Sequence, residues 1–369
     1  MSPHTSATND LSSLLFSTGE RSSTPIIGPV EISRVGVVHL RGLVATRDIS
    51  PGECLFVVDP SASAPALEVW NRWEKSDGGR SIESFAEDVL LEDMRRCLDS
   101  DAGAAASFMA LFGEDGGKGE SSSSSSSSGA FQDNSSLMDL LLGRGTLEGN
   151  VGVTDKKALL GIVRRNAFGP DYRNYAAIEE EWSTKKGTGG CPPVSRRLLG
   201  MYPLSAIINH SCEPNAVRVF AGETMLVHSS ASICKGQEIL WSYIPPSQTY
   251  GQRQSQILSK YGFRCACARC QNESSALESV EGLAEQLASM DELNLQYTMG
   301  KGATKMEEIL KDKRLSNETR RYLRVGYTNL YINHFNSTLL ELGEIAPPNA
   351  NAIREKVLLL ATQLHFAFA

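Results

Sequence analysis

The run IINHSCEPNAVR, residues 207–218, places an asparagine, a histidine and a cysteine beside a turn. Asn209, His210 and Cys212 all carry side chains that can bind a ligand or a metal, and Pro214 indicates the turn. Taken alone, Cys212 can be a nucleophile, a metal ligand or a small buried residue. Its role therefore depends on which other side chains lie beside it.

A tight group of three cysteines follows further along the chain. Cys265, Cys267 and Cys270 form a C-x-C-x-x-C motif, and three thiolates at this spacing can reach one ion. Tetrahedral zinc takes four nitrogen or sulfur ligands, so a fourth must come from a distant segment, and Cys212 would complete the set. We predict a structural zinc; three buried cysteines in a turn, an iron–sulfur cluster and a redox pair are the alternatives.

Two arginines flank the cysteine motif. Arg264 precedes Cys265 and Arg269 precedes Cys270. A zinc ion with four thiolates carries excess negative charge, which a nearby cation stabilises. We expect Arg264 and Arg269 to provide that charge.

Composition indicates a soluble globular protein of two or three domains. The chain has 369 residues, of which 41% are hydrophobic and 21% charged. Acidic residues outnumber basic ones by 43 to 36, for a net charge of −7, so we expect no direct contact with nucleic acid. No segment reaches the roughly 18 apolar residues of a membrane span, and we expect no membrane contact. We expect a monomer.

The N-terminus and the scattered cysteines bear on location. The first residues lack the basic start and apolar core of a secretory signal, and their acids fit an organellar presequence poorly. We therefore predict a disordered tail. Without a secretory signal, the eight cysteines favour a reducing compartment over a disulfide framework. Cytosol and nucleus both fit.

The elements that must position these residues are visible in the hydrophobic pattern. Residues 30–59 are rich in apolar and β-branched residues around a turn and predict strands. Residues 65–142 predict helices, one of them after a capping box formed by Ser84 and Glu87. The serine-rich stretch 113–136 interrupts this region and predicts a flexible loop.

The second half of the chain changes from mixed to helical character. Residues 154–168 predict an amphipathic helix, and residues 216–244 predict strands with turns at Gly222 and Gly236. After residue 275 the pattern is helical to the end, without a recognisable repeat. The last residues, LHFAFA, are apolar, which indicates a truncated chain or a missing partner surface.

The motifs together resemble the SET-and-MYND family of SET-domain protein lysine methyltransferases. The family's asparagine–histidine–serine–cysteine–x–proline–asparagine signature stands complete at 209–215, and EILWSYI contains Tyr243 of the second core motif. The post-SET ending begins at Tyr261 and runs into the three cysteines. The segments RGLVATRDISPGE and RRNAFG match two upstream blocks. The five blocks cover roughly residues 30–60 and 155–270.

The resemblance implies an α+β fold: a SET domain of several short β-sheets with a zinc-stapled post-SET segment, followed by an α-helical C-terminal domain. Along the chain, the expected parts are a disordered N-terminal tail (1–28), the SET N-terminal part (29–60), a helical and serine-rich insert in the MYND position (61–153), the SET core (154–246), the post-SET zinc segment (247–272) and the helical C-terminal domain (273–369).

The resemblance also assigns a role to each candidate residue, with S-adenosylmethionine as methyl donor and zinc as a structural ion. The implied zinc ligands are Cys212, Cys265, Cys267 and Cys270. The implied cofactor-binding residues are His39, Leu40, Arg41, Asn166, Asn209, His210 and Phe263, the last packing on the adenine. The implied lysine channel consists of Phe168, Tyr243 and Tyr261, with the two tyrosines catalytic.

The residue types suit that chemistry. Methyl transfer to an amine is an in-line displacement, so positioning supplies much of the rate. The amine must be neutral, and an apolar aromatic channel favours the neutral form by desolvation. The hydroxyl of Tyr243 can orient the amine, and aromatic faces accommodate a cation. For His210 we prefer a main-chain contact with the cofactor over a ring acting as general base.

Two departures from the family pattern bear on function. Leu40 stands where the family usually has a glycine, which affects the loop expected to hold the cofactor. Residues 60–155 contain a single cysteine, Cys97, and no histidine, so a MYND zinc finger cannot form there.

Three function classes follow. The first is an active methyltransferase acting on an accessible lysine of a histone or another protein. The second is a catalytically inactive SET module that serves as a zinc-stapled interaction scaffold, for which Leu40 is the positive sign. The third, a metal-dependent hydrolase using His210, lacks a further ligand cluster. The first is favoured by the presence of five motif residues: Asn209, His210, Tyr243, Tyr261 and Phe263.

Overall fold

The chain folds into two compact units. Unit 1 comprises Met1–Asn209 and Pro214–Trp241, and unit 2 comprises His210–Glu213 and Ser242–Ala369. The computed structural model describes these residues of the chain: 25–35, 40–76, 78–100, 102–111, 134–142, 144, 156–169, 175–188, 197–295 and 301–344. The N-terminal tail up to residue 24, the serine-rich loop up to residue 133 and the final LHFAFA, all subjects of the predictions above, lie outside them.

Unit 1 holds the β-structure, which confirms the expectation of several short sheets. The described strands form four sheets with the orders β1-β4-β10-β9, β2-β3, β5-β7-β6 and β11-β8. Their bounds are β1 (Ile26–Ile27), β2 (Val30–Val35), β3 (Leu40–Ala45), β4 (Cys54–Val58), β5 (Ala62–Pro65), β6 (Ala167–Phe168), β7 (Arg197–Met201), β8 (Asn209–His210), β9 (Ala216–Ala221), β10 (Thr224–Ser229) and β11 (Leu240–Trp241).

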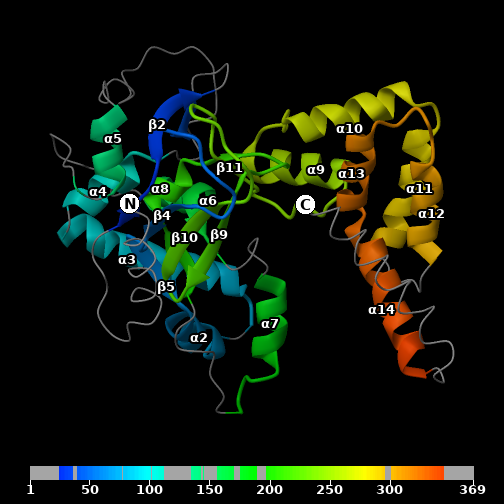
Figure 1. The fold of residues 1–369 in the computed structure, drawn as a ribbon. Helices are drawn as coiled ribbons and strands as arrows, with labels where there is room; N and C mark the ends of the chain where they lie inside the picture. Colours follow the sequence, from blue (N-terminus) through cyan, green and yellow to red (C-terminus); the bar gives the residue numbers. More distant parts are fainter. Residues whose placement is uncertain are drawn as a thin grey trace, which may run out of the picture. The chain divides into compact units, whose positions relative to one another are not determined.

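The largest sheet is organised around β4 and β10, which run antiparallel with Val227 opposite Phe56. Leu55 and Phe56 on β4 are completely buried. On β10, buried and half-buried residues alternate, as expected for a strand with one face on a core. β9 lies beside β10 (Figure 1) and exposes Val219 to solvent. The strands predicted at residues 30–59 and 216–244 are therefore present, and the structure adds which of their faces is buried.

Helices cover the sheets of unit 1. They are α2 (Ala66–Glu74), α3 (Ile82–Ser100), α4 (Ala102–Met109), α5 (Asn134–Leu141), α6 (Lys156–Asn166), α7 (Tyr175–Ser183) and the short α8 (Pro203–Ala206). Trp70 of α2 meets Trp182 of α7 edge to face, with ring centroids 5.2 Å apart and planes at 80°, a preferred geometry for aromatic pairs. The predicted amphipathic helix at 154–168 is confirmed as α6.

The capping box predicted at Ser84 and Glu87 is wrong. Helix α3 begins at Ile82, and the hydroxyl of Ser81 accepts the N–H of Ser84 at 3.3 Å. The carboxylate of Glu87 pairs instead with Arg164 at 3.2 Å. Because Ile82 is completely buried, the apolar stripe of the helix starts one turn earlier than the capping pattern indicates.

Unit 2 is helical, which confirms the predicted change of character after residue 275. Its helices are α9 (Tyr250–Tyr261), α10 (Ala268–Ser279), α11 (Leu283–Leu295), α12 (Lys301–Leu310), α13 (Asn317–Gly326) and α14 (Thr328–Glu344). α11, α12 and α14 lie side by side in this unit (Figure 1) and share a core that includes Met290, Met306 and Tyr331. Among the described helices, none combines the length and apolarity needed to cross a bilayer.

We predict that Leu55→Ala lowers the free energy of unfolding by about 2–5 kcal/mol, because it removes a completely buried side chain and leaves a cavity. The matched control is Val219→Ala in the same sheet, whose side chain is 52% exposed. It should change the free energy by no more than about 0.5 kcal/mol. Urea denaturation of both variants measures the difference, and equal effects would contradict the assignment of the core face.

Candidate functional site

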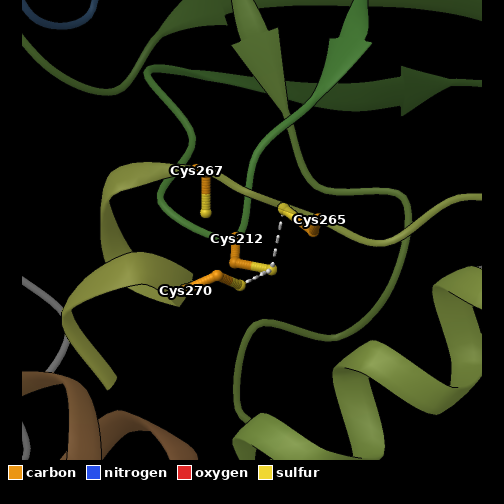
Figure 2. Close-up of side chains that lie close together, drawn as sticks. All are labelled: Cys212, Cys265, Cys267 and Cys270. Atoms are coloured by element: carbon orange, nitrogen blue, oxygen red, sulfur yellow. Dashed lines mark hydrogen bonds between the residues drawn. The ribbon is translucent and has the colours of Figure 1, made fainter. Parts of the chain in front are cut away.

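Four cysteines converge in unit 2, as Figure 2 shows. Cys212 lies on the turn after β8, while Cys265, Cys267 and Cys270 come from the connection between α9 and α10 and from the first turn of α10. The four Sγ atoms all lie within 4.8 Å of one another. Cys212 Sγ is 3.9 Å from Cys265 Sγ and 3.6 Å from Cys270 Sγ. The structure thus brings together the set that the sequence motifs indicate.

The spacing of the sulfurs fits a tetrahedral zinc ion. With Zn–S bonds of about 2.3 Å, the edge of the tetrahedron is about 3.8 Å, close to the two measured separations. None of the seven described cysteines forms a disulfide, so all four thiols are available as ligands. A zinc ion held here would tie the turn of Cys212 to α10 and thereby stabilise unit 2.

The segment that carries Cys265 and Cys267 is held in place by α9. This helix starts with a capping box made by Thr249 and Gln252 and ends at Gly262, whose φ of 78° is suited to glycine. The side chain of Gln254 then makes two hydrogen bonds to one residue: it donates to Cys265 O at 2.8 Å and accepts from Cys265 N at 3.2 Å. The ligand segment is therefore held in place from the helix side.

A buried charged network surrounds the sulfurs. Arg253, Arg269 and Glu273 are each no more than 2% exposed. Arg253 donates to the carboxylate of Glu273 and lies 3.9 Å from Cys270 Sγ. Arg269 donates to Cys212 O at 3.3 Å and contacts Glu273 at 3.4 Å. The two arginines place positive charge beside the four-thiol cluster.

This network corrects one prediction and supports another. Arg269 does lie beside the cluster, but Arg264 is exposed, and Arg253 provides the second cation. The sequence gives no sign of the roles of Arg253 and Glu273, since each lies on a polar stretch of helix with no local signal of burial. Only the contacts of Arg253 with Cys270 and with Glu273 reveal their role.

The thiols influence one another's ionisation. The hydrogen bond with Cys212, the largest cause, lowers the pKa of Cys267 to about 6. The hydrogen bond with Cys265 raises the pKa of the Cys212 thiol. Thiols this close share protons and do not all ionise together without a cation. Bound zinc requires all four as thiolates, so its binding releases protons.

Next to the cluster, unit 2 assembles an aromatic group from four predicted site residues. The ring of His210 has its centroid 5.2 Å from that of Tyr243 and 6.3 Å from that of Phe263. Tyr243 and Tyr261 form a tilted pair, with centroids 4.9 Å apart and planes at 49°. His210, Tyr243 and Tyr261 are half-buried, and Phe263 is 39% exposed.

In unit 1, Asn209 is held by two acceptors. Its Nδ2 donates to Arg41 O at 3.0 Å and to Glu238 Oε1 at 2.7 Å. Burial raises the pKa of the Glu238 carboxyl, and the Asn209 bond acts in the opposite direction. A Cβ at Gly42 would lie 2.7 Å from Glu238 Oε1, so a larger residue there would displace the carboxylate that Asn209 contacts. Glu238 is a third residue whose role the sequence does not reveal, although it begins the quoted EILWSYI run.

Phe168 belongs to a separate aromatic cluster in unit 1. Its ring packs edge-on against Trp241, with centroids 5.3 Å apart, and against Tyr202 at 5.9 Å. The guanidinium of Arg218 lies 5.5 Å from the Phe168 centroid, within the range of a cation–π contact. The Phe168 ring is thus half-buried, and the guanidinium of Arg218 lies near it.

Three further residues, His39, Leu40 and Asn166, were predicted from the sequence to bind the cofactor. His39 lies outside the described residues, and for Leu40 the structure describes the main chain of β3 but not the side chain. Asn166 is buried and donates from Nδ2 to Ile162 O at 2.8 Å, one turn earlier in α6. Their roles toward a cofactor stay predictions.

We predict that the purified protein contains about one zinc ion per chain and that Cys270→Ser removes most of it, because the fourth ligand is lost. The matched control is Cys234→Ser, at an exposed cysteine outside the cluster, which should leave the zinc content unchanged. Metal analysis measures both. A zinc content of zero in a folded wild type, or equal loss in both variants, would contradict the site.

We predict that Arg253→Leu destabilises the protein by about 3 kcal/mol, because it removes one partner of a buried ion pair and leaves Glu273, 1% exposed, with less compensation. Arg314→Leu is the control, since Arg314 pairs with Asp312 at the surface and such pairs add little. Thermal unfolding of the two zinc-loaded variants compares them. Equal melting temperatures would show that the buried network does not stabilise the cluster.

Relatives of the chain match it over limited segments. It is 45% identical over 74 residues to histone-lysine N-methyltransferase ASHR1 of Arabidopsis thaliana, which is 20% of this chain and 15% of that protein. It is 30% identical over 106 residues to histone-lysine N-methyltransferase SMYD3 of Homo sapiens, which is 27% of this chain and 25% of that protein. The matched segments thus span about a quarter or less of these relatives.

A comparison with solved structures gives a weak likeness. The structure of Rubisco LSMT bound to AdoMet aligns over 93% of this chain and 85% of that chain, with a TM-score of 0.31 and 14% identity. The family comparison is stronger: the SET domain model matches residues 40–244, more than half of the chain. The chain therefore belongs to the SET domain family.

Proposed function

We propose that the protein is an S-adenosylmethionine-dependent protein-lysine N-methyltransferase. The observation that carries the proposal is the half-buried pair of Tyr243 and Tyr261, with ring centroids 4.9 Å apart, in unit 2. Two adjacent, tilted phenol rings offer aromatic faces to an aliphatic amine and hydroxyls that can orient it. The relatives named above, which carry methyltransferase names, support the same reaction.

Two features fit the proposed cofactor. Phe263 presents a ring that is 39% exposed, and such a ring can pack against a planar adenine. Asn209 has its Nδ2 committed to Arg41 O and Glu238, which fixes the orientation of the side-chain amide. We propose cofactor-binding roles for these residues, for the main chain of His39 to Arg41 and of His210, and for Asn166.

In this proposal the protein acts mainly by positioning. S-adenosylmethionine supplies the methyl group. The aromatic rings of Tyr243 and Tyr261 exclude water from the lysine amine and favour its neutral, nucleophilic form. The Tyr243 hydroxyl accepts or donates a hydrogen bond that aligns the amine. Phe168 is proposed as a further wall of the lysine channel. Alignment of this kind accounts for a large part of the rate of an in-line transfer.

The proposed substrate is a protein with an accessible lysine, a histone or another protein. The net charge of −7 suits a partner segment rich in basic residues. We further propose that the protein acts as a monomer, without direct contact with nucleic acid or membrane, in the cytosol, the nucleus or both. The seven described cysteines are free thiols, which is in keeping with a reducing compartment.

The test compares the wild type with Tyr243→Phe, which keeps the ring and removes the hydroxyl. We expect saturable binding of S-adenosylmethionine to both by calorimetry. We expect transfer of radiolabelled methyl to a histone mixture or cell lysate to fall by about 100-fold or more in the variant, because alignment of the amine is lost.

Tyr175→Phe is the matched control, since Tyr175 is a buried tyrosine of unit 1 whose hydroxyl donates to Leu198 O at 3.1 Å. Its transfer rate should stay within about twofold of the wild type. A folded, zinc-loaded wild type that binds no S-adenosylmethionine would overturn the methyltransferase and leave the zinc-stapled interaction scaffold. Equal activity of wild type and Tyr243→Phe would overturn the role of the hydroxyl.

A further inference from the structure

The imidazole of His210 lies between the cysteine cluster and Tyr243, all within unit 2. Its Nδ1 accepts a hydrogen bond from the main-chain N–H of Tyr243 at 3.0 Å. Its Nε2 lies 3.3 Å from Cys212 Sγ. The ring therefore contacts a zinc-ligand sulfur with one nitrogen and the main chain of a proposed catalytic residue with the other.

These two contacts determine the tautomer of a neutral ring. A backbone N–H can only donate, so Nδ1 must offer its lone pair to Tyr243. The proton of the neutral imidazole then sits on Nε2, where it points to Cys212 Sγ. A zinc-bound cysteine is a thiolate and accepts that hydrogen bond. Both contacts are satisfied at once only in this arrangement.

We propose that the His210 ring is a positioning residue that connects the zinc-bound Cys212 thiolate to the main chain of Tyr243. The zinc centre then holds Tyr243 as well as the turn after β8. This inference rests on the proposed function only for the importance of Tyr243; the connection itself is a statement about two hydrogen bonds.

The surrounding geometry makes the connection short and stiff. One planar ring spans the whole path from sulfur to peptide nitrogen, so no rotatable chain lies between its two contacts. The ring also packs against the Tyr243 ring, with centroids 5.2 Å apart. Any movement of Cys212 is therefore passed to the residue that bears the proposed catalytic hydroxyl. Partners of this kind orient metal ligands in many sites, and their loss weakens metal binding about 10–100-fold.

Three variants separate the two contacts of the ring. His210→Asn places a carbonyl oxygen near the position of Nδ1 and lacks the donor to Cys212. His210→Gln places an amide nitrogen near the position of Nε2 and lacks the acceptor for Tyr243. His210→Phe keeps a planar ring and removes both contacts. The full-length protein is used throughout, loaded with zinc or with cobalt(II), which reports on its thiolate ligands through charge-transfer bands.

The contact with Cys212 is read from the metal. Loss of a donor to a thiolate moves the cobalt charge-transfer bands to longer wavelength and weakens zinc binding in a chelator competition. We expect both changes in His210→Phe and His210→Asn, with zinc affinity lower by about tenfold, and neither change in His210→Gln. The contact with Tyr243 is read from hydrogen exchange of the peptide containing residues 242–244. Exchange should be several-fold faster in His210→Phe and His210→Gln and unchanged in His210→Asn.

The matched control is His228→Phe, the same substitution at a half-buried histidine of β10 in unit 1. It should change neither the cobalt bands nor exchange at residues 242–244. Cobalt bands and zinc affinity in His210→Phe equal to those of the wild type would overturn the donor contact. Unchanged exchange in His210→Phe would overturn the contact with Tyr243. Neither readout requires methyl transfer, so failure of the proposed function leaves this test intact.

Discussion

Excess negative charge at one point is the constraint on which unit 2 depends. Four thiolates around a divalent ion leave two negative charges within a buried site, where they are poorly solvated. Arg253 and Arg269 supply two positive charges, and Glu273 returns one negative charge while it holds both guanidinium groups in place. A buried charge requires such compensation. The helices α9 and α10 thus carry the counter-charges of the cluster, and α10 also carries one of its ligands, Cys270.

The parts of the site that the sequence predicts depend on local spacing, and the parts that it does not predict depend on tertiary contacts. Spacing alone predicted that Cys265, Cys267 and Cys270 share an ion, because their separation is local. Arg264 was placed wrongly because proximity along the chain does not fix the direction of a side chain: Cys265 is buried, whereas the neighbouring Arg264 is exposed. Arg253 and Glu238 could not be found, since they meet their partners through tertiary contacts that leave no trace in a local pattern. The strands could be predicted from the sequence, because runs of apolar and β-branched residues between turn signals are typical of strands.

The residue at the variable position of the signature motif contacts a helix of unit 2. Glu213, the x of the motif, accepts hydrogen bonds from Arg321 and, at 2.6 Å, from the hydroxyl of Tyr322. Both donors lie on α13, far along the chain. The four residues His210–Glu213 thus make three kinds of contact within unit 2: with the cysteine cluster, with the aromatic group and with a helix of the C-terminal region. This explains why these residues group with unit 2, although the chain on both sides of them belongs to unit 1.

Because segments of the two units alternate along the chain, the four cysteines are not synthesised together. On the ribosome, the chain emerges from its N-terminus, so His210–Glu213 and the strands β9 to β11 appear before any residue from Ser242 onward. The first zinc ligand must wait for three others encoded 53 to 58 positions later. During that interval most of unit 1 is already available to fold. Metal capture would therefore close a loop around strands that are already synthesised, so zinc loading follows the synthesis of unit 1.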